Sequence, residues 1–193
     1  MAANRLAHYR RGAQRRHVLI DAAAEVLLEH GLAALSHRGV AARAGLPLAS
    51  TTYYFSSVDE LREEALQHLA AEWFTRAAEL VDALAASIDR AAAARAVVGI
   101  IGADAPPSRI LLVYERYLEA GRHERLRPFV VAWNAEIKQL VHEVLLRAAL
   151  PAGEETASLV LAVADGAAIT ALAEGSPAAV AVRTALGQVF SLL

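Results

Sequence analysis

The chain has no cysteine among its 193 residues, and it contains only one lysine, Lys138. Without thiols, the protein can form neither a disulfide framework nor a cysteine-based metal site, and a cytoplasmic location is the natural expectation. Because lysine is so scarce, arginine supplies nearly all of the fixed positive charge. Any basic surface must therefore be built from arginine.

The sequence predicts neither a secretion signal nor a membrane span. The arginine-rich start of the chain runs into a segment that carries acidic residues at positions 21, 25 and 29, which interrupts the apolar centre that a signal peptide needs. The most apolar stretch, residues 157–173, contains Asp165 and Gly166 and is shorter than a bilayer-spanning helix. We therefore expect no membrane association.

The motifs of the common enzyme classes are missing as well. No histidine follows a glutamate by three residues, which removes the paired Glu-x-x-His ligands of a di-iron bundle. No two glycines stand two residues apart, and neither a Gly-x-Ser-x-Gly elbow nor a phosphate-binding loop occurs. We therefore expect no enzyme activity, no cofactor and no metal.

What the sequence does contain is an uneven distribution of charge. Residues 1–57 carry seven arginines and three acidic residues, whereas residues 58–193 carry twelve basic and eighteen acidic residues. The net charges are +4 and −6, and they combine to the −2 of the whole chain. A basic head on an acidic body indicates two separate roles, with an anionic partner for the head.

Helical periodicity runs through the whole chain, and no alternating apolar and polar segment predicts a strand. Glycine, proline and capping residues separate the helical segments. The sequence therefore predicts an all-α fold of about nine helices, spanning residues 14–30, 36–44, 48–55, 58–84, 87–102, 107–120, 127–150, 154–174 and 177–193.

Two of these segments are too short to be stable alone. Ser36 is suited to cap the helix that follows it, with Leu35 and Val40 placed as a hydrophobic staple, and Gly45 ends that helix. The short helix after the turn completes the spacing of a helix-turn-helix. We expect a DNA-binding domain at residues 1–57, including a basic N-terminal arm, and a second helical domain at residues 58–193.

The segment RRHVLIDAAAEVLLEHGLAALSHRGVAARAGLPLASTTYYFSSVDEL, residues 15–61, resembles the TetR family of bacterial transcription regulators. Its order of helix, glycine, capped helix, Ala-Gly turn, Tyr-Phe and capping box is typical of that family. Two positions depart from the family pattern, because Thr52 stands where a tyrosine is frequent and Val58 where a lysine is usual. VLAVADGAAITAL, residues 160–172, is similar to the penultimate helix of the family.

The resemblance implies which residues contact DNA. The start of the second helix is expected near phosphates, and the exposed side chains of the third helix are expected to reach base edges in the major groove. The predicted set is Ser36, His37, Arg38, Ala49, Ser50, Thr51, Thr52, Tyr53 and Tyr54. Packing of the tyrosines in the core is the alternative. Arg10, Arg11, Arg15 and Arg16 form either an electrostatic DNA arm or a solvated tail.

A homodimer is expected, since helix-turn-helix proteins usually pair to read the two halves of a palindromic operator in double-stranded DNA. The last two helices are the predicted interface, because they are too apolar for solvent. The alternative is that these residues are buried within one subunit. The candidates are Leu159, Leu161, Ala164, Ala168 and Ala171, followed by Val180, Leu186, Val189 and Phe190.

The family resemblance further implies a pocket for a small-molecule effector among the middle helices. The alternative is that the aromatic residues are ordinary core. The candidates for lining the pocket are Trp73, Phe74, Tyr114, Tyr117, Trp133, Asn134 and His142, with Arg116 and His123 as polar anchors. The predicted function is a repressor that a small molecule releases from its operator. The alternative function is a structural or non-specific DNA-associated protein without an effector.

Overall fold

The computed structural model describes the backbone of residues 2–193 and the side chains of residues 12–193. Arg10 and Arg11 of the predicted arm lie outside the described side chains. The described residues form nine α-helices, two short 3-10 turns and no strand, which confirms the predicted all-α fold. They divide into two compact units, Met1–Glu72 and Trp73–Leu193.

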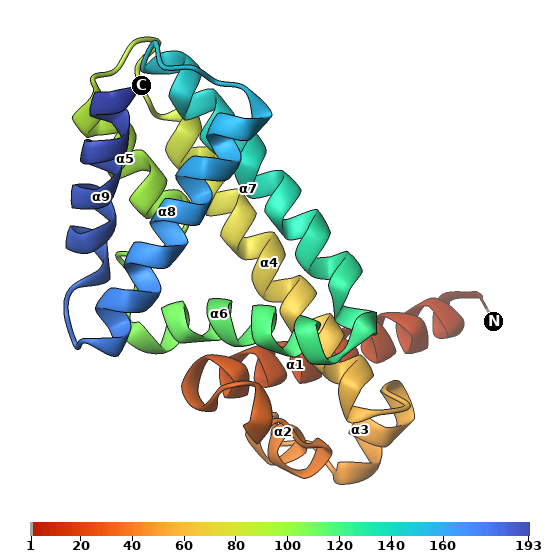
Figure 1. Ribbon diagram of the computed structural model, residues 1–193. Coiled ribbons are helices and arrows are strands. Elements are labelled where there is room, and N and C mark those ends of the chain that lie inside the picture. Colours follow the sequence, from red (N-terminus) through yellow and green to blue (C-terminus); the bar gives the residue numbers. More distant parts are fainter. Residues whose placement is uncertain (1) are drawn as a thin grey trace. The chain divides into compact units, whose positions relative to one another are not determined.

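The N-terminal unit, residues 1–72, contains three helices and the first part of a fourth (Figure 1). α2 packs against both α1 and α3. Leu19, Val40, Phe55 and Leu61 are completely buried and form its core. The elements are α1 (Ala2–His30), the 3-10 turn η1 (Leu32–Ala34), α2 (His37–Arg43), α3 (Leu48–Tyr54) and α4 (Val58–Asp82).

α4 contributes to both units, so the compact division falls at Glu72, inside this helix, and not before it at Ser57. The physical reason is that the first part of α4 is tied to α1. The Arg16 guanidinium donates a hydrogen bond of 2.6 Å to Glu64, and His68 lies 3.3 Å from Asp21.

The C-terminal unit, residues 73–193, is a bundle of the remaining helices. α8 packs against α7 and α9, and α5 packs against α7 and α9 (Figure 1). The elements are α5 (Arg90–Ile100), α6 (Pro107–Arg122), the 3-10 turn η2 (Glu124–Leu126), α7 (Arg127–Arg147), α8 (Glu154–Ala173) and α9 (Ala178–Leu192).

Side-chain caps fix several of these boundaries. The Ser36 hydroxyl accepts a 3.1 Å hydrogen bond from the Gly39 amide, which confirms the predicted cap of α2. At the start of α4, Ser57 accepts from the Glu60 amide at 3.1 Å. The Glu60 carboxylate, however, accepts from Ser56, one residue before the partner that the predicted capping box requires.

Some predicted boundaries were wrong. α1 begins at Ala2, well before position 14. α5 begins at Arg90, after the predicted start at position 87, and is capped by Asp89, whose carboxylate accepts a 2.6 Å hydrogen bond from the Ala92 amide. α9 begins at Ala178, directly after Pro177. An aspartate cap combines the hydrogen bond with a favourable negative charge at the helix N-terminus, so Asp89 stabilises the start of α5 in two ways.

α8 is 20 residues long and apolar enough to cross a bilayer by length and composition, so the expectation that this stretch is too short was wrong. The core helix of a soluble protein meets the same criterion. Here Val160, Ala164 and Ala168 are completely buried in the C-terminal unit, where α8 packs on α7 and α9. Part of the apolar surface of α8 is thus used for packing inside the C-terminal unit, while Leu159 and Ile169 remain exposed.

Candidate DNA-binding surface and effector cavity

The turn between α2 and α3 depends on a glycine. Gly45 has a φ of 63°, in the left-handed region that side chains rarely adopt. Its amide donates to Ala42 and the next amide, that of Leu46, donates to Ala41, which satisfies the last carbonyls of α2. The chain can then reverse within a few residues and begin α3.

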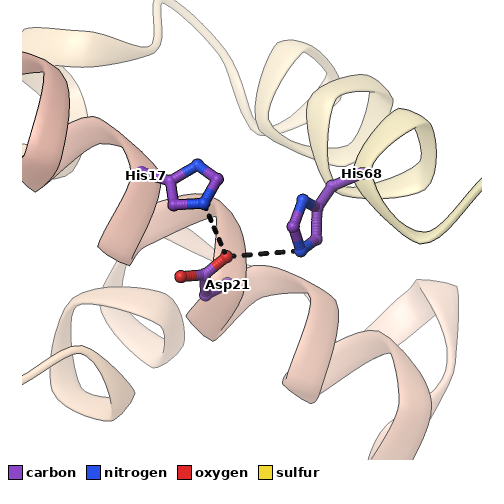
Figure 2. Close-up of side chains that lie close together, drawn as sticks. All are labelled: His17, Asp21 and His68. Carbon is purple, nitrogen blue, oxygen red and sulfur yellow. Dashed lines mark ion pairs between the residues drawn. The ribbon is translucent and has the colours of Figure 1, made fainter. Parts of the chain in front are cut away.

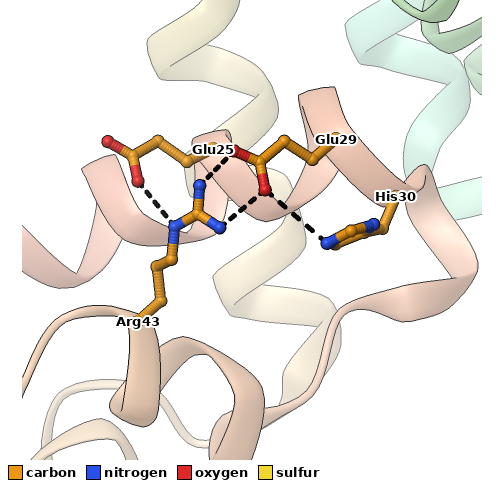
Figure 3. A network of polar contacts seen from close by, with 4 residues as sticks. All are labelled: Glu25, Glu29, His30 and Arg43. Atoms are coloured by element: carbon orange, nitrogen blue, oxygen red, sulfur yellow. Dashed lines mark hydrogen bonds and ion pairs between the residues drawn. The ribbon is translucent and has the colours of Figure 1, made fainter.

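Arg43 holds α2 to α1 (Figure 3). Its Nε donates a 2.8 Å hydrogen bond to Glu25, and its Nη1 donates a 2.6 Å hydrogen bond to Glu29. The hydrogen bonds from Arg43 lower the pKa of Glu29, and those two carboxylates raise the pKa of Arg43. His30 lies 3.6 Å from Glu29. Arg38 and Arg43 are both exposed on α2, but Arg43 is committed to contacts within the N-terminal unit.

α3 presents one polar face to solvent. Tyr53 is 80% exposed and makes an edge contact with Tyr54, whose ring centroid is 4.9 Å away. Tyr54 is half-buried, and Phe55 is buried as expected. An exposed aromatic side chain of this size is available to touch another molecule.

Most of the other predicted DNA contacts are accessible, but one is not. Thr51 is completely buried, and its hydroxyl donates a 2.8 Å hydrogen bond to the Leu48 carbonyl, so it cannot reach DNA. This residue faces the core one turn before Phe55, on the inner side of α3. The exposed or half-buried members of the predicted set are Ser36, His37, Arg38, Ala49, Ser50 and Thr52.

In the C-terminal unit, aromatic side chains gather around Trp133 of α7. The ring centroids of Phe74 and Trp73, both on α4, lie 4.7 Å and 5.5 Å from that of Trp133. The Trp73 indole donates a 2.8 Å hydrogen bond to the Ile100 carbonyl. Gly102 permits this position, because a Cβ there would lie 2.3 Å from the Trp73 ring. These contacts fix two indoles beside one small cavity.

The cavity has a free volume of about 10 Å³, which is room for about one water molecule. Its walls come from α4, α6, α7 and α8 and from the residue that follows α5. The lining residues are Trp73, Ile101, Val113, Arg116, Tyr117, Trp133, Ile137, Leu161 and Asp165.

Arg116 of α6 is the most unusual lining residue. Only 4% of it is exposed, and its guanidinium carbon lies 3.6 Å from the centroid of the Trp133 ring and 5.0 Å from that of Tyr117. Its Nε and Nη2 have no hydrogen-bond partner. Burial lowers the pKa of Arg116 to about 10, so the group is still a cation at neutral pH. A buried cation with two unpaired donors is costly.

Asp165 of α8 is the acidic counterpart. Tyr114 donates a hydrogen bond of 3.2 Å to its carboxylate. Burial raises the pKa of Asp165 to about 6, although the Tyr114 hydrogen bond and the Arg116 charge oppose this shift. Burial also raises the pKa of Tyr114 and of Tyr117, which donates to Asn134 at 2.6 Å. The cavity thus combines flat aromatic walls with one cation and one titratable acid.

Most of the residues that were predicted to bind an effector lie at or beside this cavity. Trp73, Tyr117 and Trp133 line it, while Phe74, Tyr114 and Asn134 contact lining residues. His142 is not part of the cavity lining, because it is exposed and its Nδ1 pairs with the Ala152 carbonyl. His123 is also exposed, 3.3 Å from Glu119.

Sequence reasoning missed Asp165 as a site residue. The signal was present, since an acid in the middle of the most apolar stretch of a protein needs a partner or a function. Leu161, predicted at the dimer interface, lines the cavity as well.

Most of the other predicted interface residues are also turned inward. Ala164, Ala168, Ala171, Leu186 and Phe190 are at most 2% exposed, and Val189 is half-buried. The five buried side chains lie in the unit where α8 packs on α9, and they offer almost no surface to a second chain. Leu159 and Val180, from the same prediction, are each 48% exposed.

Comparison with known proteins decides the family. A family model described as bacterial regulatory proteins of the tetR family matches residues 19–65, and one described as the tetracyclin repressor-like C-terminal domain matches residues 88–192. The chain belongs to the TetR family. A TetR regulator is a DNA-binding protein, and the helix-turn-helix of this chain is its DNA-binding element.

Solved TetR-like structures support the same assignment. The multidrug binding protein EbrR, complexed with imidazole, is 34% identical, with a TM-score of 0.70 over 91% of this chain and 94% of that one. The TetR-family protein SCO1917 from Streptomyces coelicolor A3 is 34% identical, with a TM-score of 0.69 over 91% and 98% of the two chains. A comparison with curated protein sequences gives no match.

Proposed function

We propose that this TetR-family regulator is a homodimeric repressor that leaves a palindromic operator when a small aromatic molecule enters the cavity around Trp133. The observation that carries the proposal is the pairing of two features. Tyr53 and Arg38 are exposed on the helix-turn-helix, and a buried cation stacks on an indole in the C-terminal unit. The first feature suits DNA recognition, and the second suits ligand exchange.

The reading surface would use Arg38 for phosphates and the outer face of α3 for bases. Ala49, Thr52 and Tyr53 are exposed on that helix and offer a methyl group, a hydroxyl and an aromatic ring. Such groups contact thymine methyls and base edges in a major groove. Arg43 would act indirectly, by fixing α2 through Glu25 and Glu29.

The dimer would form through the outward face of α8 and α9. Leu159, Gly166 and Ile169 are exposed at helical spacing on α8, and Val180 and Gly187 are exposed on α9. A Cβ at either glycine would meet nothing within the chain, so a partner helix could approach closely there. A two-fold dimer places the same face of each subunit against the other and matches a palindromic site.

The effector would be a flat aromatic compound that takes the place of the Arg116 guanidinium on Trp133. In the unliganded cavity, this guanidinium covers the indole face that a ligand ring would use. Structures of EbrR contain proflavin and ethidium, which are flat aromatic molecules. Since Asp165 lies in the same lining, a cationic ring would also gain an acidic neighbour.

Release from DNA requires that the ligand favours one conformation over another. Trp73 lines the cavity and is part of α4, whose residues up to Glu72 belong to the N-terminal unit. A ligand that shifts Trp73 would therefore act on a helix that the DNA-binding unit shares. Trp73→Ala should then change the effector response and leave DNA affinity without effector nearly intact.

The test is binding of the purified protein to DNA from beside its own gene, in competition with random DNA and across a salt series. The proposal expects a palindrome to bind tighter than random DNA by ~10³ or more. Proflavin should then weaken operator binding. Equal, weak binding to all DNA sequences would overturn the proposal of a repressor and favour a non-specific DNA-binding role.

A further inference from the structure

Two histidines and two acids meet between α1 and α4 in the N-terminal unit, away from the helix-turn-helix contacts described above. His17 and Asp21 belong to α1, and His68 and Glu72 belong to α4. Figure 2 shows the imidazoles of His17 and His68 on either side of the Asp21 carboxylate. We propose that these four side chains form a binding site for a zinc ion.

The distances suit a metal better than they suit hydrogen bonds. The Asp21 Oδ1 atom lies 3.3 Å from His68 Nε2 and 3.7 Å from His17 Nε2, and His68 Nε2 lies 3.5 Å from Glu72 Oε1. All of these exceed the usual N–H···O range. Ligand atoms that sit 2.0–2.1 Å from zinc in a tetrahedron are roughly 3.3 Å apart.

Three of the ligand atoms lie close enough together to converge on one ion. The metal-binding atoms of His17, Asp21 and His68 all lie within 4.8 Å of one another. Side-chain rotations that shorten these separations to roughly 3.3 Å would bring them to a common centre. Glu72 then supplies a fourth ligand from the helical turn after His68.

The position of these residues on their helices explains the arrangement. Each helix offers a histidine and an acid four residues later, and such pairs share one face of a helix. Two facing pairs make a four-ligand site on rigid elements, which hold geometry better than loops. The two imidazole rings also make an edge contact, with centroids 5.4 Å apart at an interplanar angle of 87°.

The donor set selects the kind of metal. Two imidazole nitrogens with carboxylate oxygens suit zinc and its neighbours, whereas magnesium and calcium prefer oxygen alone. The two acids carry two negative charges that would balance a divalent cation. All four side chains are at least partly accessible to solvent, so an ion can enter.

The test is calorimetric titration of zinc chloride into the full-length, untagged protein after treatment with a chelator, at neutral pH. The expected result is one zinc per chain. His17→Ala and His68→Ala should each weaken zinc binding by at least the roughly 10–100-fold that loss of an outer-shell partner costs. Zinc should also raise the thermal midpoint of unfolding of the wild type, and magnesium should not.

His30→Ala is the matched control. His30 ends the same helix and also lies beside an acid, Glu29 at 3.6 Å, but it lacks the pair from α4. Its removal should leave zinc affinity unchanged. Asp21→Asn keeps the size of the side chain and provides a second loss-of-ligand variant if an alanine variant folds poorly. Absence of zinc binding at millimolar concentration, or binding that neither histidine substitution weakens, would overturn the site.

Discussion

The guanidinium carbon of Arg116 lies 3.6 Å from the centroid of the Trp133 ring, and two of its nitrogens have no hydrogen-bond partner. A cation–π contact recovers part of the cost of burying the charge. The unpaired donors are not compensated. We therefore expect the buried Arg116 side chain to lower the stability of the folded protein. Strongly perturbed buried groups of this kind occur more often at functional sites than in purely structural positions.

Arg116→Met should remove that cost, because it keeps much of the side-chain volume and deletes the unpaired donors. We expect the free energy of unfolding to rise by ~1 kcal/mol, the lower end of the penalty for an unsatisfied buried group. Urea denaturation measures this change. Arg109→Met, at a half-buried position on the same helix, is the comparison. A marked loss of stability for Arg116→Met alone would show that the cation contributes to the fold.

Asp165 should make stability depend on pH. Its pKa rises from 3.8 to about 6 in the folded protein, so the folded state holds the proton more tightly than the unfolded state. Stability should fall as pH rises from 3.8 to about 6, and the penalty remains above that range.

Asp165→Asn should remove this dependence and stabilise the protein at neutral pH by at most ~3 kcal/mol, the equivalent of about two pKa units. Chemical denaturation of both proteins at several pH values measures the difference. If the wild type and the variant have parallel pH profiles, the Asp165 carboxyl titrates at its ordinary pKa.

Ser36→Ala should cost ~1 kcal/mol of stability, because the Gly39 amide loses its capping partner. Thermal unfolding measures the loss. Ser108→Ala, at an exposed position in the first turn of α6, should change stability by no more than about 0.5 kcal/mol. Equal effects of the two substitutions would argue against a stabilising cap at Ser36.

Arg38 and Arg43 provide a paired test on one helix. Arg38→Ala should weaken operator binding and, by removing a phosphate interaction, reduce the slope of log affinity against log salt by about one. The free energy of unfolding of the Arg38→Ala variant should equal that of the wild type, since Arg38 is exposed. Arg43→Ala should instead lower stability, because Glu25 and Glu29 lose their partner. If Arg38→Ala lowered stability and Arg43→Ala reduced the salt dependence of DNA binding, Arg43 would be the phosphate contact and Arg38 the structural residue.

Ile169→Asp should separate the proposed dimer. Ile169 is 46% exposed on the outward face of α8, and a carboxylate there would be buried on association. Analytical ultracentrifugation should show a monomer, and operator binding should fall. Leu111→Asp, at a position 48% exposed on α6, is the control and should remain dimeric. A dimeric Ile169→Asp variant would place the interface elsewhere.

The fold could be predicted largely because its boundaries are local. Ser36 and Gly45 define the ends of α2 through contacts within a few residues, and such signals are visible in a sequence. The start of α1 was not predicted. Its first turns lie before the apolar periodicity that marks the rest of the helix.

The candidate site was less predictable, because faces of apolar helices are set by tertiary packing. α8 is apolar on all sides, so its sequence did not distinguish the buried Ala164 and Ala168 from the exposed Leu159 and Ile169. Thr51 resembles its polar neighbours but faces inward. The pairing of His17 and Asp21 with His68 joins residues that are far apart in the chain, and no spacing rule indicates it.

The small free volume beside Trp133 has a kinetic consequence. Under the proposed function, a cavity of about 10 Å³ would admit an aromatic ring only after the Arg116 side chain moves out. Ligand association should therefore be limited at high ligand concentration by this opening step, and its observed rate should reach a plateau instead of rising in proportion to concentration. The time needed to detect an effector would then be set by the exchange of one side chain and not by diffusion.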